Sequence, residues 1–147
     1  MSSSAEATGR QGRIVVGVDG APGSLAALRW AVAEARLREA TVEAVIAWAP
    51  PQTYGFTPAY PTEDFQADAT VGLQQAIDSV QNDSDGVEIV PTVTEGRPAP
   101  VLLAAAAKAD LLVVGSRGHG GFAGMLLGSV SQHCVHHAIG PVVVVPQ

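Results

Sequence analysis

Cysteine and lysine are almost absent from this 147-residue sequence, which contains one residue of each, Cys134 and Lys108. A single cysteine excludes an internal disulfide and a metal site built from several thiolates, and it fits a reducing cytosol. Eight basic residues stand against fourteen acidic ones, a net charge of −6, and the arginines do not cluster. A basic face that neutralises many phosphates is not expected, so we do not predict nucleic acid as a partner.

Charged residues are also scarce, at 15% against roughly 25% in an average soluble domain, while hydrophobic residues make up 47%. This balance excludes a disordered acidic chain and favours one compact domain with a largely buried sheet. No apolar run approaches the ~20 residues of a membrane span, and residues 1–12 lack the apolar core of a signal peptide. We therefore expect a cytoplasmic protein with no membrane partner, comprising a flexible tail at 1–12 and one domain at 13–147.

Short apolar runs alternate with helical periodicity along the chain. Runs rich in Val and Ile between turn residues are typical of strands buried on both faces, and Ser24 can cap the first helix. We predict strands at 13–18, 41–48, 87–94, 110–114 and 141–145, the third nearer a sheet edge, and helices at 24–39, 63–81, 98–109 and 129–138. This order predicts an α/β fold: a single doubly wound, open parallel sheet with helices on both faces. Its ligands would bind beyond the carboxyl ends of the strands, and the loops after the first and fourth strands would face each other if those strands are neighbours.

The stretch Gly115–Ser129 is the main functional signal. Its glycines allow positive φ angles that turn backbone amides inward, which is how an anion-binding concavity is built. It leads into a helix amino terminus, where free amides and the helix dipole favour phosphate. Ser129 and Ser131 add hydroxyl donors, and Arg117 or His119 can add charge. The alternative is a flexible connection in which Ser129 is an ordinary helix cap.

Other phosphate-binding and hydrolase motifs are missing. A Walker A loop requires a lysine before its hydroxyl residue, and Gly128-Ser129 lacks one. A dinucleotide fingerprint belongs after the first strand, whereas the loose match Gly118-x-Gly120-x-x-Ala123 follows the fourth. No Gly-x-Ser-x-Gly elbow of a serine hydrolase occurs.

Asp19, after the first predicted strand, is the second signal. Its carboxylate can accept hydrogen bonds from a ribose or from water on Mg²⁺, and its alternative role is turn formation with Gly20. His133 and His137 form an i, i+4 pair, but no Glu accompanies them, so we do not interpret them as metal ligands. Four aromatic residues could stack on a base, although core packing and loop anchoring are favoured: Trp48, Tyr54, Phe56 and Tyr60.

The sequence resembles the universal stress protein family, in its nucleotide-binding branch, from about Arg13 to Val145. Val15–Gly20, Ala109–Ser116 and the glycine-rich stretch carry the resemblance. The ATP-binding spacing of the family is Gly, two residues, Gly, nine residues, Gly, then Ser or Thr. Here that spacing is filled by Gly115, Gly118, Gly128 and Ser129.

The resemblance implies a five-stranded sheet in the order 3-2-1-4-5 and ATP, with Mg²⁺, as the cofactor. Phosphates would lie in the loop at 115–131, Asp19 would meet the ribose or a metal through water, and main-chain groups near Ala47 and Trp48 would recognise adenine. The family commonly dimerises through its last strand, here 142–145. The implied nucleotide contacts are Gly17, Val18, Asp19, Ala47, Trp48, Gly115, Arg117, Gly118, His119, Gly121, Phe122, Gly128, Ser129, Val130 and Ser131.

Two departures and several alternatives accompany this resemblance. Many members carry a serine where this chain has Ala21, and the Pro-rich segment 50–62 varies too much for any carry-over. We expect an ATP-binding protein of stress-response regulation with at most slow hydrolysis or autophosphorylation, because no positioned base, nucleophile or arginine clamp is evident apart from Asp19, His119 and Arg117. One alternative is a dimeric interaction module that works without nucleotide. Others are a true adenine-nucleotide hydrolase or transferase, and AMP or cyclic AMP as the ligand.

Overall fold

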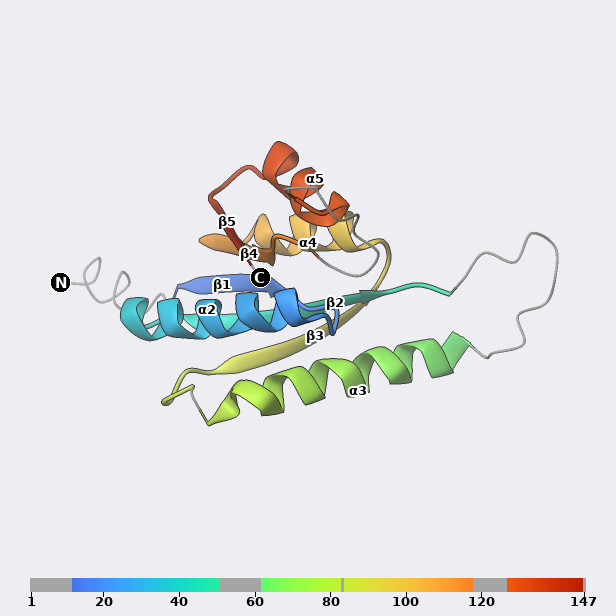
Figure 1. The fold of residues 1–147 in the computed structure, drawn as a ribbon, viewed down its shortest axis with the longest axis horizontal. Helices are drawn as coiled ribbons and strands as arrows, with labels where there is room; N and C mark the ends of the chain where they lie inside the picture. The colour runs from blue at the N-terminus through green and yellow to red at the C-terminus, as the bar shows by residue number, and fades with distance from the viewer. Residues whose placement is uncertain (1–11, 51–61, 83, 118–126, 147) are drawn as a thin grey trace, which may run out of the picture.

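The computed structural model describes residues 12–50, 62–82, 84–117 and 127–146. Within them, strands and helices alternate in the predicted order (Figure 1). The strands are β1 (Arg13–Gly17), β2 (Thr41–Trp48), β3 (Ile89–Glu95), β4 (Leu111–Gly115) and β5 (Val142–Val145). The helices are α2 (Pro22–Arg38), α3 (Thr62–Gln81), α4 (Pro98–Ala106) and α5 (Ser129–His137). The expected tail lies outside the described residues except for Gly12, whose carbonyl accepts a hydrogen bond from Thr41 N (2.8 Å).

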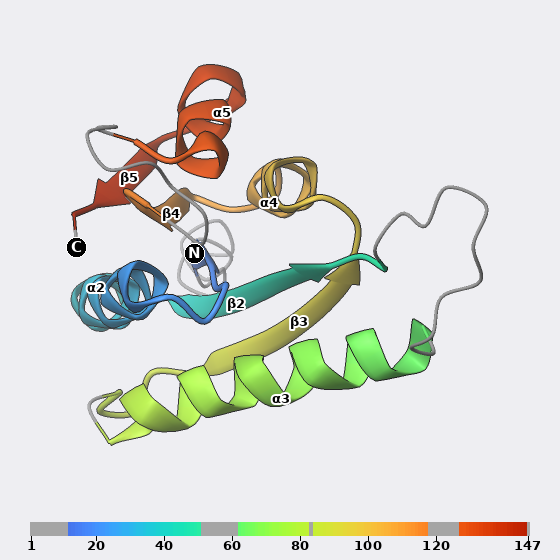
Figure 2. The same ribbon diagram turned by 45° about the vertical axis from the view of Figure 1, so that its right-hand side comes forward.

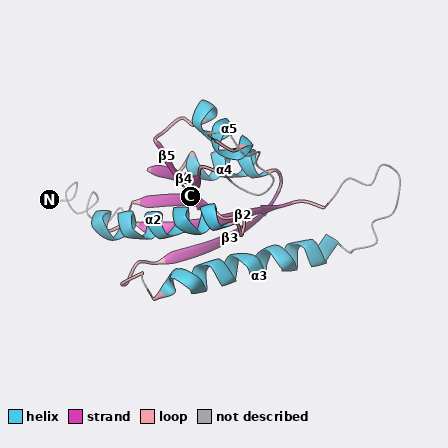
Figure 3. Ribbon diagram, viewed as in Figure 1, coloured by secondary structure: helices cyan, strands magenta, loops and turns pink. Residues whose placement is uncertain are grey.

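The five strands form one parallel sheet in the order β3-β2-β1-β4-β5. From β1 the chain proceeds outward to β3, returns to the other side of β1, and proceeds outward again to β5. Right-handed crossovers therefore put α2 and α3 on one face of the sheet and α4 and α5 on the other (Figure 2, Figure 3). The predicted fold class and strand order are confirmed.

The centre of the sheet is buried on both faces. Ile14, Val15 and Val16 of β1 are each fully buried. Because successive side chains point to opposite faces, Ile14 and Val16 join the core under α2 and α3, whereas Val15 joins the core under α4 and α5. This two-sided burial explains why β1 is a continuous apolar run rather than an alternating one.

The outer edge of β3 is interrupted by Pro91. Val42 N donates to Glu88 O (2.9 Å) and Gly96 N donates to Trp48 O (2.8 Å), so even-numbered residues of this segment face β2. Pro91 therefore faces outward, where its missing N–H breaks no ladder hydrogen bond. The predicted edge position of this strand is confirmed.

The other edge strand, β5, consists of four valines. Leu112 N donates to Pro141 O (3.1 Å) and Ser116 N donates to Val145 O (2.8 Å), so odd-numbered residues face β4. The N–H and C=O groups of Val142 and Val144 consequently face away from the sheet. An edge of this kind, with neither proline nor charge, is open to another strand.

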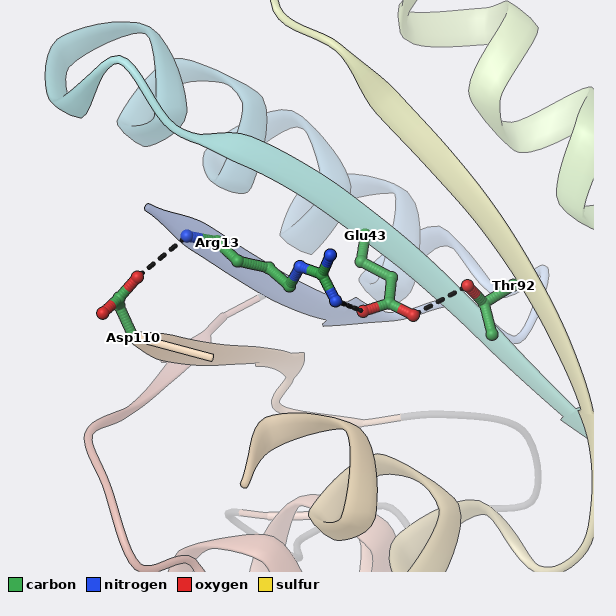
Figure 4. A network of polar contacts seen from close by, with 4 residues as sticks. All are labelled: Arg13, Glu43, Thr92 and Asp110. Atoms are coloured by element: carbon green, nitrogen blue, oxygen red, sulfur yellow. Dashed lines mark hydrogen bonds and ion pairs between the residues drawn. The ribbon is translucent and has the colours of Figure 1, made fainter. Parts of the chain in front are cut away.

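A polar network joins the first three strands of the chain and the start of β4 (Figure 4). Glu43 Oε2 accepts a hydrogen bond from Thr92 Oγ1 (2.7 Å), and Glu43 Oε1 pairs with Arg13 Nη1 (3.3 Å). Arg13 N donates to Asp110 Oδ2 (2.8 Å). Since Arg13 and Asp110 lie at the amino ends of β1 and β4, this network fastens the end of the sheet opposite the expected ligand site.

Several element boundaries differ from those predicted. Helix α2 begins at Pro22, two residues early, because a proline in the first turn already has the φ angle of a helix. The predicted Ser24 cap is wrong: the N-cap is Ala21, with no side-chain cap. Strand β3 begins at Ile89 because Val87 N closes a turn onto Ser84 O (3.0 Å). Among the described residues, no helix combines the length and apolar character needed to span a bilayer.

Candidate functional site

The candidate site lies where the strand order reverses. β1 and β4 are neighbours, with Val16 opposite Val113, yet their connections lead to helices on opposite faces. In open α/β sheets, such a switch point at the carboxyl ends of the strands is where ligands bind. The condition for the loops after the first and fourth strands to face each other, that these strands are neighbours, is confirmed, whereas 118–126 lies outside the described residues.

The two connections are in backbone contact. A Cβ atom on Gly115 would lie 2.8 Å from the carbonyl oxygen of Gly23, and a Cβ on Gly23 would lie 2.7 Å from that of Arg117. No side chain fits at either distance, so both glycines are required by the close approach. The start of α2 is thereby packed directly against the end of β4.

Ser116 holds the two ends of the glycine-rich connection together. Its N–H donates to Val145 O (2.8 Å), and its carbonyl accepts from Gly128 N (2.6 Å) and from Ser131 Oγ (3.0 Å). Ser131 Oγ also lies 3.1 Å from Gly128 O. The connection therefore leaves β4 and enters α5 at one hydrogen-bonded junction, next to the end of β5.

The amino terminus of α5 has an uncapped first turn. Its N-cap is Gly128, with no side-chain cap and no acidic residue in the first turn. Gln132 N donates to Gly128 O (2.9 Å), which leaves the amides of Ser129, Val130 and Ser131 without an acceptor among the described residues. The alternative that Ser129 is an ordinary cap does not hold, because Ser129 is the first helical residue and its side chain is exposed.

Ser131 differs from Ser129 although both are serines of this turn. Ser131 is 2% exposed, and its hydroxyl proton is directed at the carbonyl oxygens of the junction. The Ser131 side chain thus bonds to the start of the connection, whereas the Ser131 backbone N–H is one of the three amides without an acceptor among the described residues.

Asp19 begins the turn between β1 and α2. Its Oδ1 accepts a hydrogen bond from Ala21 N (2.8 Å), its backbone N–H donates to Ser24 Oγ (3.1 Å), and Gly20 adopts φ +84°. The turn role considered for Asp19 is therefore present. The residue is exposed, and within the described part of the chain its other carboxylate oxygen has no partner, so it remains available to a ligand.

The end of β2 supplies backbone groups beside the switch point. Val18, directly after β1, donates its N–H to Val45 O (2.9 Å), and this is the last backbone hydrogen bond from this segment to β2. Trp48 O accepts from Gly96 N on the opposite side, so the N–H and C=O of Ala47 face past the end of β1. Gly17 lies beneath α4, because a Cβ there would be 2.7 Å from Leu102 Cδ1.

Part of the predicted site lies outside the described residues: Gly118, His119, Gly121 and Phe122, as well as the aromatic residues Tyr54, Phe56 and Tyr60. His133 and His137 are exposed, with ring centroids 4.5 Å apart. No group of three or more His, Cys, Asp or Glu side chains in the described ranges could hold a metal ion. A hollow of about 110 Å³ lies at the opposite end of the strands, where α4 and α5 end and β4 and β5 begin, and no predicted site residue lines it.

Sequence reasoning missed the packing roles of Gly23, Ser24 and Ser116. A serine five residues after the strand-ending aspartate is a signal for the Asp19–Ser24 contact, since such hydroxyls often bond to nearby backbone. The Gly23–Gly115 contact has no local signal, because it depends on which strands are neighbours.

Comparison with known proteins agrees with this geometry. The universal stress protein family model matches residues 11–146. Universal stress protein Rv2005c of Mycobacterium tuberculosis is 37% identical over 134 residues, which cover 91% of this chain and 45% of that protein. The chain thus spans about half the length of the curated relatives that it matches.

Solved structures have the same fold. UspA from Lactobacillus plantarum superimposes with a TM-score of 0.78 at 22% identity, over 92% of this chain and 98% of that one. A universal stress protein in complex with cAMP gives a TM-score of 0.72 at 28% identity, over 91% and 96% of the two chains. With the family model matching nearly its whole length and the sheet in the same arrangement, this chain belongs to the universal stress protein family.

Proposed function

We propose that this chain binds an adenine nucleotide at the carboxyl ends of β1 and β4. The observation that carries the proposal is the uncapped first turn of α5, where the amides of Ser129, Val130 and Ser131 lack acceptors among the described residues. Free amides at the positive end of a helix dipole bind phosphate oxygens. The exposed hydroxyl of Ser129 would add one donor from a side chain.

The phosphate groups would lie between this turn and the glycine-rich connection. Arg117 supplies a positive charge at its start. In a protein of net charge −6, a local cation matters for attracting an anion. The phosphate side of the proposed site comprises Gly115, Arg117, Gly118, His119, Gly121, Phe122, Gly128, Ser129, Val130 and Ser131.

The nucleoside would lie over the ends of β1 and β2. The free oxygen of Asp19 can accept hydrogen bonds from ribose hydroxyls. The backbone N–H and C=O of Ala47, with Trp48 beside it, match the donor and acceptor edge of adenine, and Gly17 and Val18 would line the pocket. The cAMP complex of a 28% identical universal stress protein supports an adenine nucleotide as the ligand class.

ATP with Mg²⁺ is the ligand that we propose first, with AMP and cyclic AMP as alternatives. Next to the carboxyl ends of β1 and β4, Asp19 is the one carboxylate among the described residues, and one of its oxygens is occupied by Ala21 N. Mg²⁺ would therefore be held chiefly by the phosphates, with Asp19 contacting it through water, which suits an ion that keeps several waters. When bound, it would neutralise phosphate charge.

The proposed role is regulatory, in the response to stress, with at most slow ATP hydrolysis or autophosphorylation. In the described part of the site, Asp19 and the half-buried Arg117 are the charged groups, and an efficient phosphoryl-transfer site needs a positioned base and several charge-stabilising groups. The buried, unpaired Cys134 suits a reducing cytoplasm.

A nucleotide-independent, dimeric interaction module is the second candidate. The outer edge of β5 favours it, since the outward backbone groups of Val142 and Val144 have no partner among the described residues, and a second copy can pair with them through residues 142–145. Ala21 also favours it, because it lacks the hydroxyl that many family members carry there.

The first test is to denature the purified protein, identify released nucleotide by mass spectrometry, and titrate ATP, AMP and cyclic AMP by calorimetry. Ser129→Ala should weaken binding several-fold through the lost donor. Ser79→Ala is a matched control, because Ser79 is an exposed serine in the distant helix α3. No released nucleotide and no binding of any of the three would overturn the proposal in favour of the interaction module.

A further inference from the structure

Three serines are the buried polar side chains of the described residues: Ser24 (4% exposed), Ser84 (4%) and Ser131 (2%). A buried hydroxyl is retained only where it is hydrogen-bonded, so each has a structural task. Ser84 lies in the turn before β3, at the opposite end of the sheet from the candidate site. Ser24 lies directly under the turn that carries Asp19.

The hydroxyl of Ser24 joins the two ends of this turn. Val18 N makes the last hydrogen bond to β2, and the next amide, Asp19 N, lies on the β4 side of the chain and donates to Ser24 Oγ (3.1 Å). Ser24 Oγ in turn donates to Ala21 O (3.1 Å). Its single proton is therefore committed to the backbone, and at 4% exposure it is unable to contact a ligand.

The same contacts determine where the Asp19 carboxylate lies. Ala21 N donates to Asp19 Oδ1 (2.8 Å), and Ala21 O accepts from Ser24 Oγ (3.1 Å) as well as from the amides of Ser24 and Leu25. The Ser24 hydroxyl thus accepts from the backbone of Asp19 and donates to the residue whose amide orients the Asp19 side chain. The remaining carboxylate oxygen of Asp19 is presented to the ligand in one orientation.

We propose that Ser24 is a positioning residue for ribose recognition by Asp19. The inference rests on the proposed function, because it assigns Asp19 to the sugar of a bound nucleotide. Ser24 itself makes no contact with the nucleotide, so its removal should change the discrimination between ribose and 2′-deoxyribose. The contribution of the phosphate side, at α5, should be retained.

The experiment measures the dissociation constants of ATP and 2′-deoxy-ATP by calorimetry for the wild-type chain, Ser24→Ala, Asp19→Asn and the double variant. We expect the wild-type protein to favour ATP by about tenfold, the size of one hydrogen bond to a charged group. Each single variant should bring the ratio of the two constants close to one. The double variant should go no further, because Ser24 acts through Asp19.

Two controls separate positioning from general stability. Ser84→Ala removes another equally buried serine that donates to a backbone carbonyl, Gln81 O, and should leave the ratio unchanged. If Ser24→Ala does not fold, Ala21→Pro tests the same chain of contacts, because it removes the amide that holds Asp19 Oδ1. Its backbone at φ −77° already suits proline.

The outcomes are distinct. An unchanged ratio in folded Ser24→Ala and in Ala21→Pro, with nucleotide still bound, would overturn this inference alone. An unchanged ratio in Asp19→Asn would overturn the assignment of Asp19 to ribose and this inference with it. No binding of either nucleotide by the wild-type protein would overturn the proposed function first.

Discussion

The carbonyl oxygen of Gly23 lies 2.8 Å from the position that a Cβ atom on Gly115 would occupy. Gly115 is also the first glycine of the family's nucleotide-binding spacing. Its small size is thus accounted for by contact with the start of α2, before any ligand is considered. Substitution at Gly115 therefore tests the packing between β4 and α2.

Gly115→Ala should destabilise the protein by about 1–3 kcal/mol, because the added methyl group overlaps backbone that has nowhere to move. Gly72→Ala, in helix α3 with no atom within 4 Å of the new methyl, should instead stabilise it by about 0.5–1 kcal/mol. Urea unfolding of both variants checks the prediction. Equal stability of Gly115→Ala and the wild-type chain would show that the two connections are able to separate.

Ser131→Ala should mainly lower the stability of the fold, whereas Ser129→Ala should mainly weaken nucleotide binding. Ser131→Ala removes the hydroxyl that bonds to Ser116 O and should lower the free energy of unfolding by about 1 kcal/mol. Ser129→Ala, at an exposed position, should stay within about 0.5 kcal/mol of wild type while weakening nucleotide binding several-fold. Thermal unfolding and calorimetric titration of both variants measure the two effects, and similar losses of stability would contradict the distinction.

The stability contributed by Cys134 should depend on pH. Burial raises the pKa of the Cys134 thiol above its ordinary value, so at alkaline pH the folded chain keeps a proton that the unfolded chain releases. The free energy of unfolding therefore falls as pH rises above about 8.5, the pKa of an unperturbed thiol. The stability difference between the wild-type protein and Cys134→Ala, measured by urea unfolding at pH 7 and pH 10, should shift against wild type at pH 10. A constant difference would contradict the prediction.

Val144→Pro should prevent the proposed dimer without unfolding the domain. The amide of Val144 faces away from β4, so proline removes a donor from the outer edge and none from the ladder within the sheet. Analytical ultracentrifugation should give a monomer for Val144→Pro and a dimer for the wild-type chain. Val144→Ala, which keeps the amide, is the matched control and should remain dimeric. If the Val144→Pro variant were still a dimer, the dimer interface would have to lie on a surface other than β5.

The fold was largely predictable because its signals are local. The apolar run at 41–48 coincides with β2, and the alternation of strands with helices was enough for a parallel sheet. The predicted ends of helices were wrong where a residue type is common both in turns and in the first turn of a helix. Pro22 and Gly23 are typical of a turn, yet they form the first turn of α2, since proline there loses no hydrogen bond.

The candidate site was predictable in its location but not in the tasks of its residues. The spacing of Gly115, Gly128 and Ser129 indicated the amino terminus of α5. Its internal contacts depend on tertiary structure: Ser131 and Ser129 have the same chemistry in sequence, and only the junction at Ser116 makes one buried and leaves the other exposed. The sequence around Ser24 likewise matches a helix N-cap, but the helix begins at Pro22, so Ser24 lies inside its first turn.

The two edge strands of the sheet, β3 and β5, differ in their ability to pair with another strand, and this limits the size of any assembly. Pro91 removes a donor from the outer rim of β3, whereas the valines of β5 leave theirs complete. If two copies pair through β5 about a twofold axis, the β5 edges of both copies are covered. The two outer edges of the dimer are then the β3 strands, each of which contains Pro91. Growth by strand addition would then stop at two copies, so the run of half-buried valines in β5 would not lead to an open-ended fibre.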